Sequence, residues 1–264
     1  YPGGHRLDVA GGSAAIIPPI DFETYSTAGI EFENGRWVSA LGKGKQKRGI
    51  GLVGAFAYAE HASTEILSLA YDLHDGDGER LWLPGLPPPS DLFDYIARGG
   101  HVEAHNALFE VAIWVNVAGK KLGVPWVPLD QLHDSAAKCS AHNIPRALAK
   151  AAAVMGTMPK QADGDRMIKL FSMPRNPTKS DQRLRLDPQT HPEGPRLYTY
   201  NRDDIRAERE LSANLPDLSP FEYRVFKADQ AVNVRGVQID LEAVHGARRI
   251  IAAASDRYTR DLML

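Results

Sequence analysis

The stretch that decides the fold is "PPIDFETYS", residues 18–26, where apolar residues lead directly into two acids. The apolar residues predict a buried strand over residues 15–22. Side chains of a strand alternate between its two faces, so Asp21 and Glu23 point to one face and Phe22 to the other. Two carboxylates side by side near a core repel each other and lose hydration, and a divalent cation is the usual compensation.

The order of the elements along the chain predicts the fold class. Strands come first, then strands alternate with helices, and helices alone follow. The expected elements after the first strand are a hairpin around "HDGDG" (residues 64–73 and 79–84), a strand (101–106), a helix (106–123), a last strand, two short helices, and a strong helix (197–215). This order indicates an α/β fold in which a mixed sheet is flanked by helices and followed by a short all-helical segment.

Local signals add loops and a helix start to this outline. Residues 41–54 are rich in glycine and lysine and predict a mobile loop. Residues 174–196 are polar and rich in proline, which also predicts a loop. Ser90 follows three prolines, and we expect its side chain to cap the helix that begins there.

The bulk composition is that of an ordinary globular protein, with 43% hydrophobic and 24% charged residues among 264. A net charge of −2 argues against a broad basic surface, so any nucleic-acid contact must be local. The single cysteine, Cys139, excludes an internal disulfide, fits a reducing cytoplasm, and is expected to pack in the core. We find no apolar window long enough for a membrane span, and we interpret residues 1–15 as a linker rather than a signal peptide.

Three acidic positions point to a metal site. The first is the pair Asp21 and Glu23, and the second is Glu110, early in the helix opened by "AHNALFE". The third is "YNRDD", where Tyr200 and Asp204 are four residues apart and share one helix face. A sheet and two helices can bring these groups together in one pocket. Each position alone fits a solvated acid or a packing tyrosine, and it is the ordered combination that carries the hypothesis. Four carboxylates and a tyrosine suit two Mg²⁺ or Mn²⁺ ions, and two such ions about 4 Å apart can clamp a phosphodiester during in-line displacement.

These three segments, in this order, resemble the motifs of the DEDD-type 3′–5′ exonucleases of the RNase H-like superfamily. "IDFETYS" is similar to their first motif, "AHNALFE" to the second, and "YNRDD" to the third motif of the tyrosine subtype. The intervening segments resemble the proofreading domain of bacteriophage- and prophage-type family A DNA polymerases. The segment "SPFEYRVFKADQAVNVRGVQID" resembles the start of that family's polymerase region. The resemblance implies an RNase H-like mixed sheet of five strands, an exonuclease domain over residues 16–215, and the beginning of a polymerase thumb over residues 216–264.

The resemblance also implies a role for each matching residue. Asp21, Glu23 and Asp204 would bind the first metal ion, and Asp21 would bridge to the second. Glu110 matches the acid of the second motif, although many relatives have aspartate there. Tyr200 would orient the attacking water.

Further residues are candidates for substrate contacts. Thr24, Asn106 and Phe109 match positions that contact the terminal nucleotide. His105 either contacts substrate or is a hydrogen-bonded histidine at a strand end. The basic cluster between the first motif and "VGAFAYAEH" is either a flap that contacts phosphates of the DNA strand or a solvated loop; its residues are Lys43, Lys45, Lys47 and Arg48. His133 and Asp134 could mimic a catalytic dyad, but no nucleophile motif accompanies them, so we interpret them as structural.

The implied activity is removal of 5′-mononucleotides from DNA 3′ ends, the proofreading reaction of a DNA polymerase. The implied partners are a single-stranded or frayed DNA 3′ end and the rest of the polymerase chain, with no membrane, and we expect a cytoplasmic monomer. Two alternatives remain open. One is an exonuclease fold that has lost its metals and serves as a DNA-binding scaffold. The other is a free-standing exoribonuclease of the same superfamily.

Overall fold

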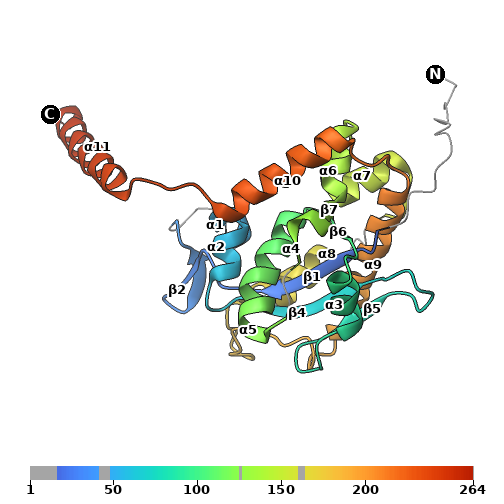
Figure 1. Ribbon diagram of the computed structural model, residues 1–264. Coiled ribbons are helices and arrows are strands. Elements are labelled where there is room, and N and C mark those ends of the chain that lie inside the picture. The colour runs from blue at the N-terminus through green and yellow to red at the C-terminus, as the bar shows by residue number, and fades with distance from the viewer. Residues whose placement is uncertain (1–16, 42–47, 125–126, 160–163, 264) are drawn as a thin grey trace, which may run out of the picture. The chain divides into compact units, whose positions relative to one another are not determined.

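The computed structural model of the chain describes residues 17–41, 48–124, 127–159 and 164–263 (Figure 1). It divides into two compact units, Tyr1–Lys227 and Ala228–Leu264. The basic residues Lys43, Lys45 and Lys47 lie outside the described residues, as do the first two residues of the strand expected over 15–22. The candidate functional residues all belong to the first unit.

The first unit is built on short strands that lie side by side. β1 (Ile20–Tyr25), β4 (Glu65–Tyr71) and β5 (Arg80–Trp82) form an antiparallel sheet in the order β1-β4-β5, which confirms the predicted hairpin. β6 (Val102–Ala104) and β7 (Leu132–Asp134) form a parallel pair. The fold is therefore mixed α/β, as predicted from the order of the elements.

The two sheets meet at the start of β1. Pro19 forms an isolated parallel bridge with Glu103 of β6, and the Glu103 N–H donates a hydrogen bond of 2.9 Å to the Pro18 carbonyl. The strands thus form two small sheets that a short bridge connects, and the expected RNase H-like sheet of five strands is not confirmed. The proline at position 19 has no N–H to donate, which limits the ladder between β1 and β6.

β1 extends further than the strand predicted from the sequence. The prediction ended the strand at residue 22, whereas β1 continues to Tyr25, because β4 pairs with it along its whole length as far as the Tyr25–Glu65 pair. A register shift between Glu23 and Thr24 marks an irregularity just after the second acid. Such bulges bend a strand locally and re-aim its side chains.

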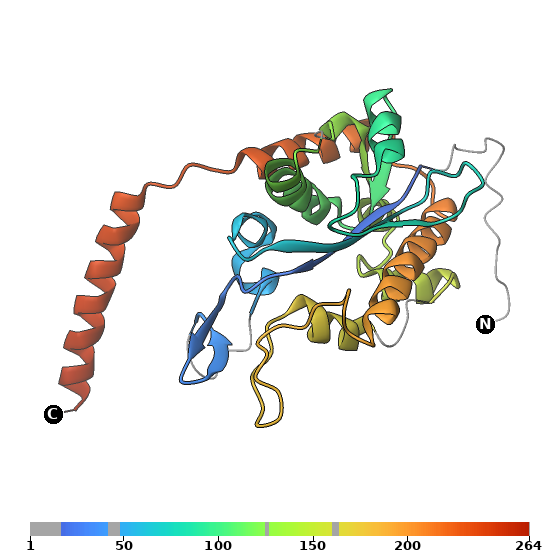
Figure 2. The ribbon, with the colours of Figure 1, turned by 90° about the horizontal axis from the view of Figure 1, so that it is seen from below.

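Helices cover both faces of these strands. α4 (Ala107–Ile113) continues through a π-helical segment (Trp114–Gly119) into α5 (Lys120–Leu122), in place of one uniform predicted helix. α9 (Gly194–Ala213) is the predicted strong helix, and it begins three residues earlier than expected. α4 and α9 lie on opposite sides of β1 and β4 (Figure 2). β1 is consequently buried at all but one of its residues.

Shorter helices complete the first unit. α6 (Ser135–Ala141) and α7 (Leu148–Met155) pack on α9, and Cys139 is fully buried in the resulting cluster with Ala207 and Leu211, as predicted. α8 (Gly164–Met167) leads into a second π-helical segment (Ile168–Ser172), whose Phe171 is buried beneath the other end of α9.

Two local predictions need correction. Ser90 begins α3 (Ser90–Ala97), but Pro89 occupies the cap position, so no side chain caps this helix. Part of the predicted loop over residues 41–54 is helical, because Ile50–Val53 form α1, just before α2 (Ala55–Glu60).

An additional hairpin, formed by β2 (Ile30–Glu33) and β3 (Arg36–Ser39), was not predicted. Asn34 and Gly35 connect its strands with φ of 50° and 76°. Asn-Gly is the preferred two-residue turn for that conformation, so the sequence did carry a signal for it.

The chain after α9 belongs partly to each unit. α10 (Pro220–Arg235) begins in the first unit, where the Tyr223 hydroxyl lies 3.0 Å from the Asp130 carbonyl and the ring stacks on His133 at 4.8 Å between centroids. The first compact unit reaches Lys227, and the domain boundary expected at residue 215 stays a prediction. The assignment of residues 216–264 to a polymerase thumb stays a prediction.

The second unit contains α11 (Leu241–Leu262), which Asp240 caps through a 2.9 Å hydrogen bond from the Ala243 N–H. None of the residues of α11 is buried. Among the described residues, no helix combines the length and the apolar character that crossing a membrane requires.

Candidate metal and active site

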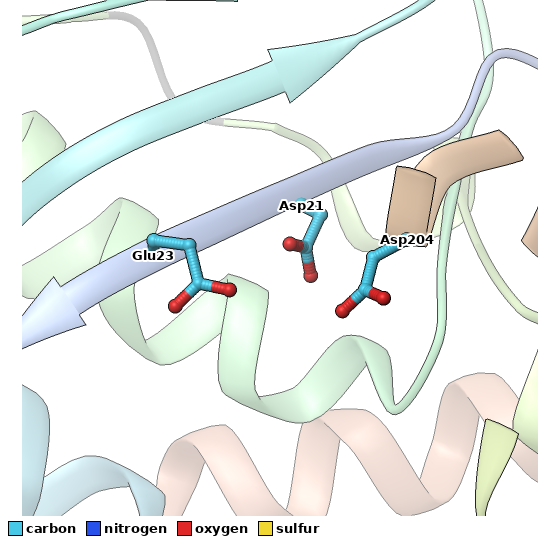
Figure 3. A group of neighbouring side chains, drawn as sticks. All are labelled: Asp21, Glu23 and Asp204. Carbon is cyan, nitrogen blue, oxygen red and sulfur yellow. The ribbon is translucent and has the colours of Figure 1, made fainter. Parts of the chain in front are cut away.

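Three of the predicted ligands meet in the first unit. Asp21 and Glu23 extend from the same side of β1 toward Asp204 of α9 (Figure 3). One carboxylate oxygen from each residue can be chosen so that the three atoms all lie within 4.8 Å of one another. Glu23 and Asp204 are buried and Asp21 is half-buried. We call these three residues the acid cluster.

Asn201 holds Asp21 in place, and the sequence analysis did not identify it. Its side-chain amide donates to Asp21 Oδ2 at 2.5 Å and to the Asp21 carbonyl at 3.2 Å. Its own oxygen accepts from the Ser68 hydroxyl of β4 at 2.8 Å. Asn201 is fully buried, so this chain of hydrogen bonds joins β4, α9 and β1 behind the cluster. The position of Asn201 between Tyr200 and Asp204 in "YNRDD" was the available signal.

Glu110 is close to the acid cluster but is not one of its three members. Its carboxylate is buried and accepts a hydrogen bond of 3.1 Å from the Phe22 N–H, between the two acids of β1. Burial first, and then the charge of Asp21, raise the pKa of Glu110 well above its ordinary value. The bond ties α4 to β1, so Glu110 supports the strand that carries the cluster.

Tyr200 lies one helical turn before Asp204 on the buried face of α9. Its ring packs in a hydrophobic cluster that includes Tyr25, Leu67 and Phe171, and its side chain is hydrogen-bonded to Asp204. Burial first, and then the negative charge of Asp204, raise the pKa of the Tyr200 phenol above its ordinary value. The hydroxyl therefore keeps its proton at neutral pH and can serve as a hydrogen-bond donor.

A cavity of about 250 Å³ lies against the acid cluster. Asp21 and Asp204 line it together with Glu208, His105 and the start of α7. Glu208 is a second residue that the sequence analysis missed, although it lies one helical turn after Asp204. It is buried and accepts a hydrogen bond from the Ser135 hydroxyl at 3.0 Å. Burial is the largest cause of a pKa raised well above the ordinary value of Glu208.

His105 lines the same cavity, but both of its ring nitrogens are engaged by the protein. Nδ1 lies 2.9 Å from the Ser135 hydroxyl, and Nε2 lies 2.6 Å from the Arg146 carbonyl. A carbonyl can only accept, so Nε2 carries a proton. This geometry matches the hydrogen-bonded alternative that the sequence left open for His105, and its contact with substrate stays a prediction.

The residues assigned to the terminal nucleotide lie on β1 and at the start of α4, where the Phe109 N–H donates to the Asn106 carbonyl at 3.0 Å. The Thr24 hydroxyl is 3.0 Å from that of Tyr58, whose ring centroid lies 6.1 Å from that of Phe109. Asn106 has a left-handed backbone with φ of 73°, and its N–H donates to the Asp134 carboxylate at 3.0 Å. Tyr58, on α2, is a third residue that the sequence analysis missed.

Asp134 has a structural role in the described part of the chain. Besides accepting from Asn106, its carboxylate caps α6 by accepting from the Ala136 N–H at 2.8 Å. His133 instead stacks on Tyr223 and contacts His101 at 2.8 Å. Both sets of contacts agree with the structural interpretation of this pair.

Comparison with known proteins relates most of the chain to a phage DNA polymerase. No protein-family profile matches the chain. A DNA polymerase of Bacillus phage SP02 is 28% identical over 201 residues, which cover 74% of this chain and 30% of that polymerase. The chain thus spans less than a third of the length of this relative, and the similarity supports a relation between most of the chain and a phage DNA polymerase.

Proposed function

We propose that the chain is the metal-dependent 3′–5′ exonuclease part of a family A DNA polymerase. The observation that carries the proposal is the convergence of Asp21, Glu23 and Asp204, which come from its first and third motifs, on one small volume. The similarity to a phage DNA polymerase supports the same proposal. The implied reaction releases 5′-mononucleotides from DNA 3′ ends.

The donor set fits Mg²⁺ or Mn²⁺. The acid cluster offers only carboxylate oxygens, which these hard cations prefer, and it lies on a strand and a helix whose positions are held by hydrogen bonds. When bound, two such ions would stabilise the charge that develops on the phosphodiester and favour attack by water. Glu110 is close enough for its pKa to respond to Asp21 and Glu23, and it would contribute through an intervening water.

The chain's own residues would do the remaining work. Asn201 keeps the Asp21 carboxylate oriented, and the protonated Tyr200 hydroxyl would hold the attacking water. The cavity beside Asp21 and Asp204 would receive the 3′ end of the DNA strand. Thr24 and Phe109, joined through Tyr58, would contact the terminal nucleotide.

The wider assignments follow from the same proposal. Residues 216–264 would begin the polymerase thumb, the rest of the polymerase chain and a frayed DNA 3′ end would be the partners, and the working location would be the cytoplasm of a bacterial or phage-infected cell. The described residues alone would not synthesise DNA.

The deciding experiment is degradation of a 5′-labelled single-stranded DNA, with Mg²⁺ or Mn²⁺ and with excess chelator. We expect a ladder that shortens from the 3′ end in single-nucleotide steps, and no shortening in chelator. The matched control is Asp21→Ala, which should retain the fold and lose about a thousandfold or more in rate.

The two alternatives give different results in the same experiment. A DNA-binding scaffold would bind the oligonucleotide without shortening it, and calorimetry with Mn²⁺ would detect no binding. An exoribonuclease would shorten a matched RNA faster than the DNA. Either result would overturn the proposal.

A further inference from the structure

Gly164, the first residue of α8, lies against Tyr200. A Cβ atom built on Gly164 would lie 2.3 Å from Cε2 of the Tyr200 ring, 2.9 Å from Cζ and 3.1 Å from the hydroxyl oxygen. Carbon atoms that are not bonded do not approach this closely in proteins, since their optimal separation is about 3.5–4.0 Å. The glycine therefore leaves room for the phenol of Tyr200.

The requirement for glycine at this position is one of space. Gly164 is helical and its φ is outside the left-handed region, so an alanine could adopt the same backbone without strain. Gly156 provides the contrast, because its φ of 67° favours glycine although no atom lies within 4 Å of its Cβ position. Among the glycines that the structure describes, only Gly164 would place a side chain against a residue of the proposed active site.

The Tyr200 ring has little freedom to move away from a side chain at position 164. It is 1% exposed and packs with Tyr25, Leu67 and Phe171, while Met167, from the same helix as Gly164, belongs to the same cluster. Protein interiors are close-packed, so an added methyl group is accommodated by displacing its neighbours. The atoms in the way are Cε2, Cζ and the hydroxyl itself, so the displacement falls on the end of Tyr200 that is hydrogen-bonded to Asp204.

We propose that Gly164 is a positioning residue, whose lack of a side chain sets the Tyr200 hydroxyl in its place beside the acid cluster. This inference rests on the proposed nuclease function for its catalytic consequence, but the contact between Gly164 and Tyr200 can be tested separately. Gly164→Ala should displace the hydroxyl while leaving the ligands of the acid cluster on β1 and α9. A misplacement of about 1 Å at a reacting group can cost a hundredfold in rate.

The catalytic test is a double-mutant cycle measured in the metal-dependent degradation assay. Gly164→Ala should lower kcat at least tenfold, with little change in KM, as should Tyr200→Phe, which removes the hydroxyl and keeps the ring. The double variant Gly164→Ala/Tyr200→Phe should be no slower than Tyr200→Phe alone, because the hydroxyl is already gone. If the two losses multiply instead, Gly164 acts on the rate independently of the hydroxyl and the inference is wrong.

Two control variants separate positioning from general damage. Gly51→Ala, in α1, adds a methyl group to a helical glycine with no atom within 4 Å and should keep the wild-type kcat. Leu211→Ala removes a buried side chain from the cluster around Cys139, so it should lower the melting temperature and still keep the wild-type kcat well below that temperature. An equal loss of kcat in Leu211→Ala would attribute the effect of Gly164→Ala to destabilisation and overturn the inference.

A spectroscopic test needs no activity. In protein with ¹³C-labelled tyrosine rings, the Tyr200 signal is the one that disappears in Tyr200→Phe. Gly164→Ala should shift that signal, and Gly51→Ala should leave it unchanged. An unchanged signal in folded Gly164→Ala overturns the contact, whereas a shifted signal in a protein that degrades no nucleic acid overturns the proposed function and leaves the contact standing.

A rescue variant covers the case in which Gly164→Ala does not fold. Leucine lacks the Cε2, Cζ and hydroxyl atoms that Cβ of residue 164 would meet. Adding Tyr200→Leu to Gly164→Ala should therefore restore folding, measured as the melting temperature relative to Tyr200→Leu alone. If the double variant still does not fold, the alanine destabilises the protein through contacts other than the Tyr200 ring, which contradicts the inference.

Discussion

α9 and α11 are the two longest helices of the described chain, with 20 and 22 residues, and they differ in how many of their residues are buried within their own unit. α9 packs on β1, β4 and the shorter helices, and its buried side chains include the polar residues Asn201, Asp204 and Glu208. α11 has no buried residue, and even its apolar Ile250 and Ile251 are 71% and 67% exposed.

This difference shows that apolar spacing is a poor guide to which helix belongs to the core. The spacing in α11 predicts an apolar face but not whether anything covers it. In α9 the buried polar residues indicate the functional face. Burying a carboxylate or an amide costs free energy unless the group has hydrogen-bond partners or a bound ion, so such residues are seldom buried by packing alone. The polar face of α9 is where the acid cluster forms.

The largest expected effect comes from Asp204→Asn in α9. Asparagine retains an oxygen that can accept from Tyr200 but loses the charge that holds a metal ion, so the nuclease rate should fall about a thousandfold or more. Its melting temperature should be equal or higher, because like charges near Asp21 are relieved. The matched substitution Asp256→Asn in α11 should leave the rate unchanged, and equal losses in both would erase the functional distinction between the two helices.

Stability should separate the two helices next. Leu211→Ala in α9 removes a fully buried side chain and should lower the free energy of unfolding by about 2–5 kcal/mol. Ile250→Ala in α11 should change it by less than about 0.5 kcal/mol, since that side chain is 71% exposed. Urea denaturation followed by circular dichroism measures both. A large loss from Ile250→Ala would mean that α11 is covered in solution.

Shortening the chain from its C-terminal end tests which part of α10 contributes to the stability of the first unit. A chain ending at Lys227 keeps Tyr223 and the buried Phe226 and should melt as the first unit of the full chain does. A chain ending at Leu215 loses both and should be less stable by about 2–3 kcal/mol, the usual contribution of a buried aromatic side chain. Equal stability of the two truncated chains would support the predicted boundary at residue 215.

The contact between His133 and Tyr223 should also make stability depend on pH. Burial first, and then the neighbouring His101, lower the pKa of His133 to about 4 in the folded protein. Lys138 and Lys227 act in the same direction, and Asp217 opposes them. The unfolded chain binds the proton at about pH 6.5, so the stabilisation is complete above that pH and is lost as the pH falls toward 4.

The measurement is the free energy of unfolding at pH 7 and pH 5, in wild type and in His133→Gln. The wild type should lose about 1–2 kcal/mol more than the variant between these two values. Identical pH dependence in the two proteins would show that His133 titrates normally and that its stacking on Tyr223 does not exclude the proton.

Prediction from sequence succeeded where the signal was local. The β4–β5 hairpin follows from two alternating runs around "HDGDG", and α9 follows from its helical periodicity and Pro216. The Asn34–Gly35 hairpin was missed although its turn is equally local. Ser90 was misplaced by one position, because either residue at that junction can begin a helix.

The candidate site was predictable in part for the same reason. Asp21 and Glu23 share a face of one strand, and Tyr200 and Asp204 share a face of one helix, so each pair followed from its own segment. Asn201, Glu208 and Gly164 were not predicted; Asn201 and Glu208 had only their positions beside Tyr200 and Asp204 on the same helix as a signal, and Gly164 had none. Their roles appear only in contacts with Asp21, Ser135 and Tyr200.

The sequence by itself determined the order of strands and helices and which acids are paired, because both depend on periodicities of two to four residues. The tertiary structure alone decided that Asp204 joins Asp21 and Glu23 while Glu110 bonds to the Phe22 N–H, and that the ring of Tyr200 lies against Gly164. These contacts join distant segments, and the hydrogen bond beside them between Asn201 and Asp21 spans 180 residues. These contacts form because α9 and α4 pack on opposite faces of β1. A pattern within a few residues of sequence carries no information about which distant segments pack together.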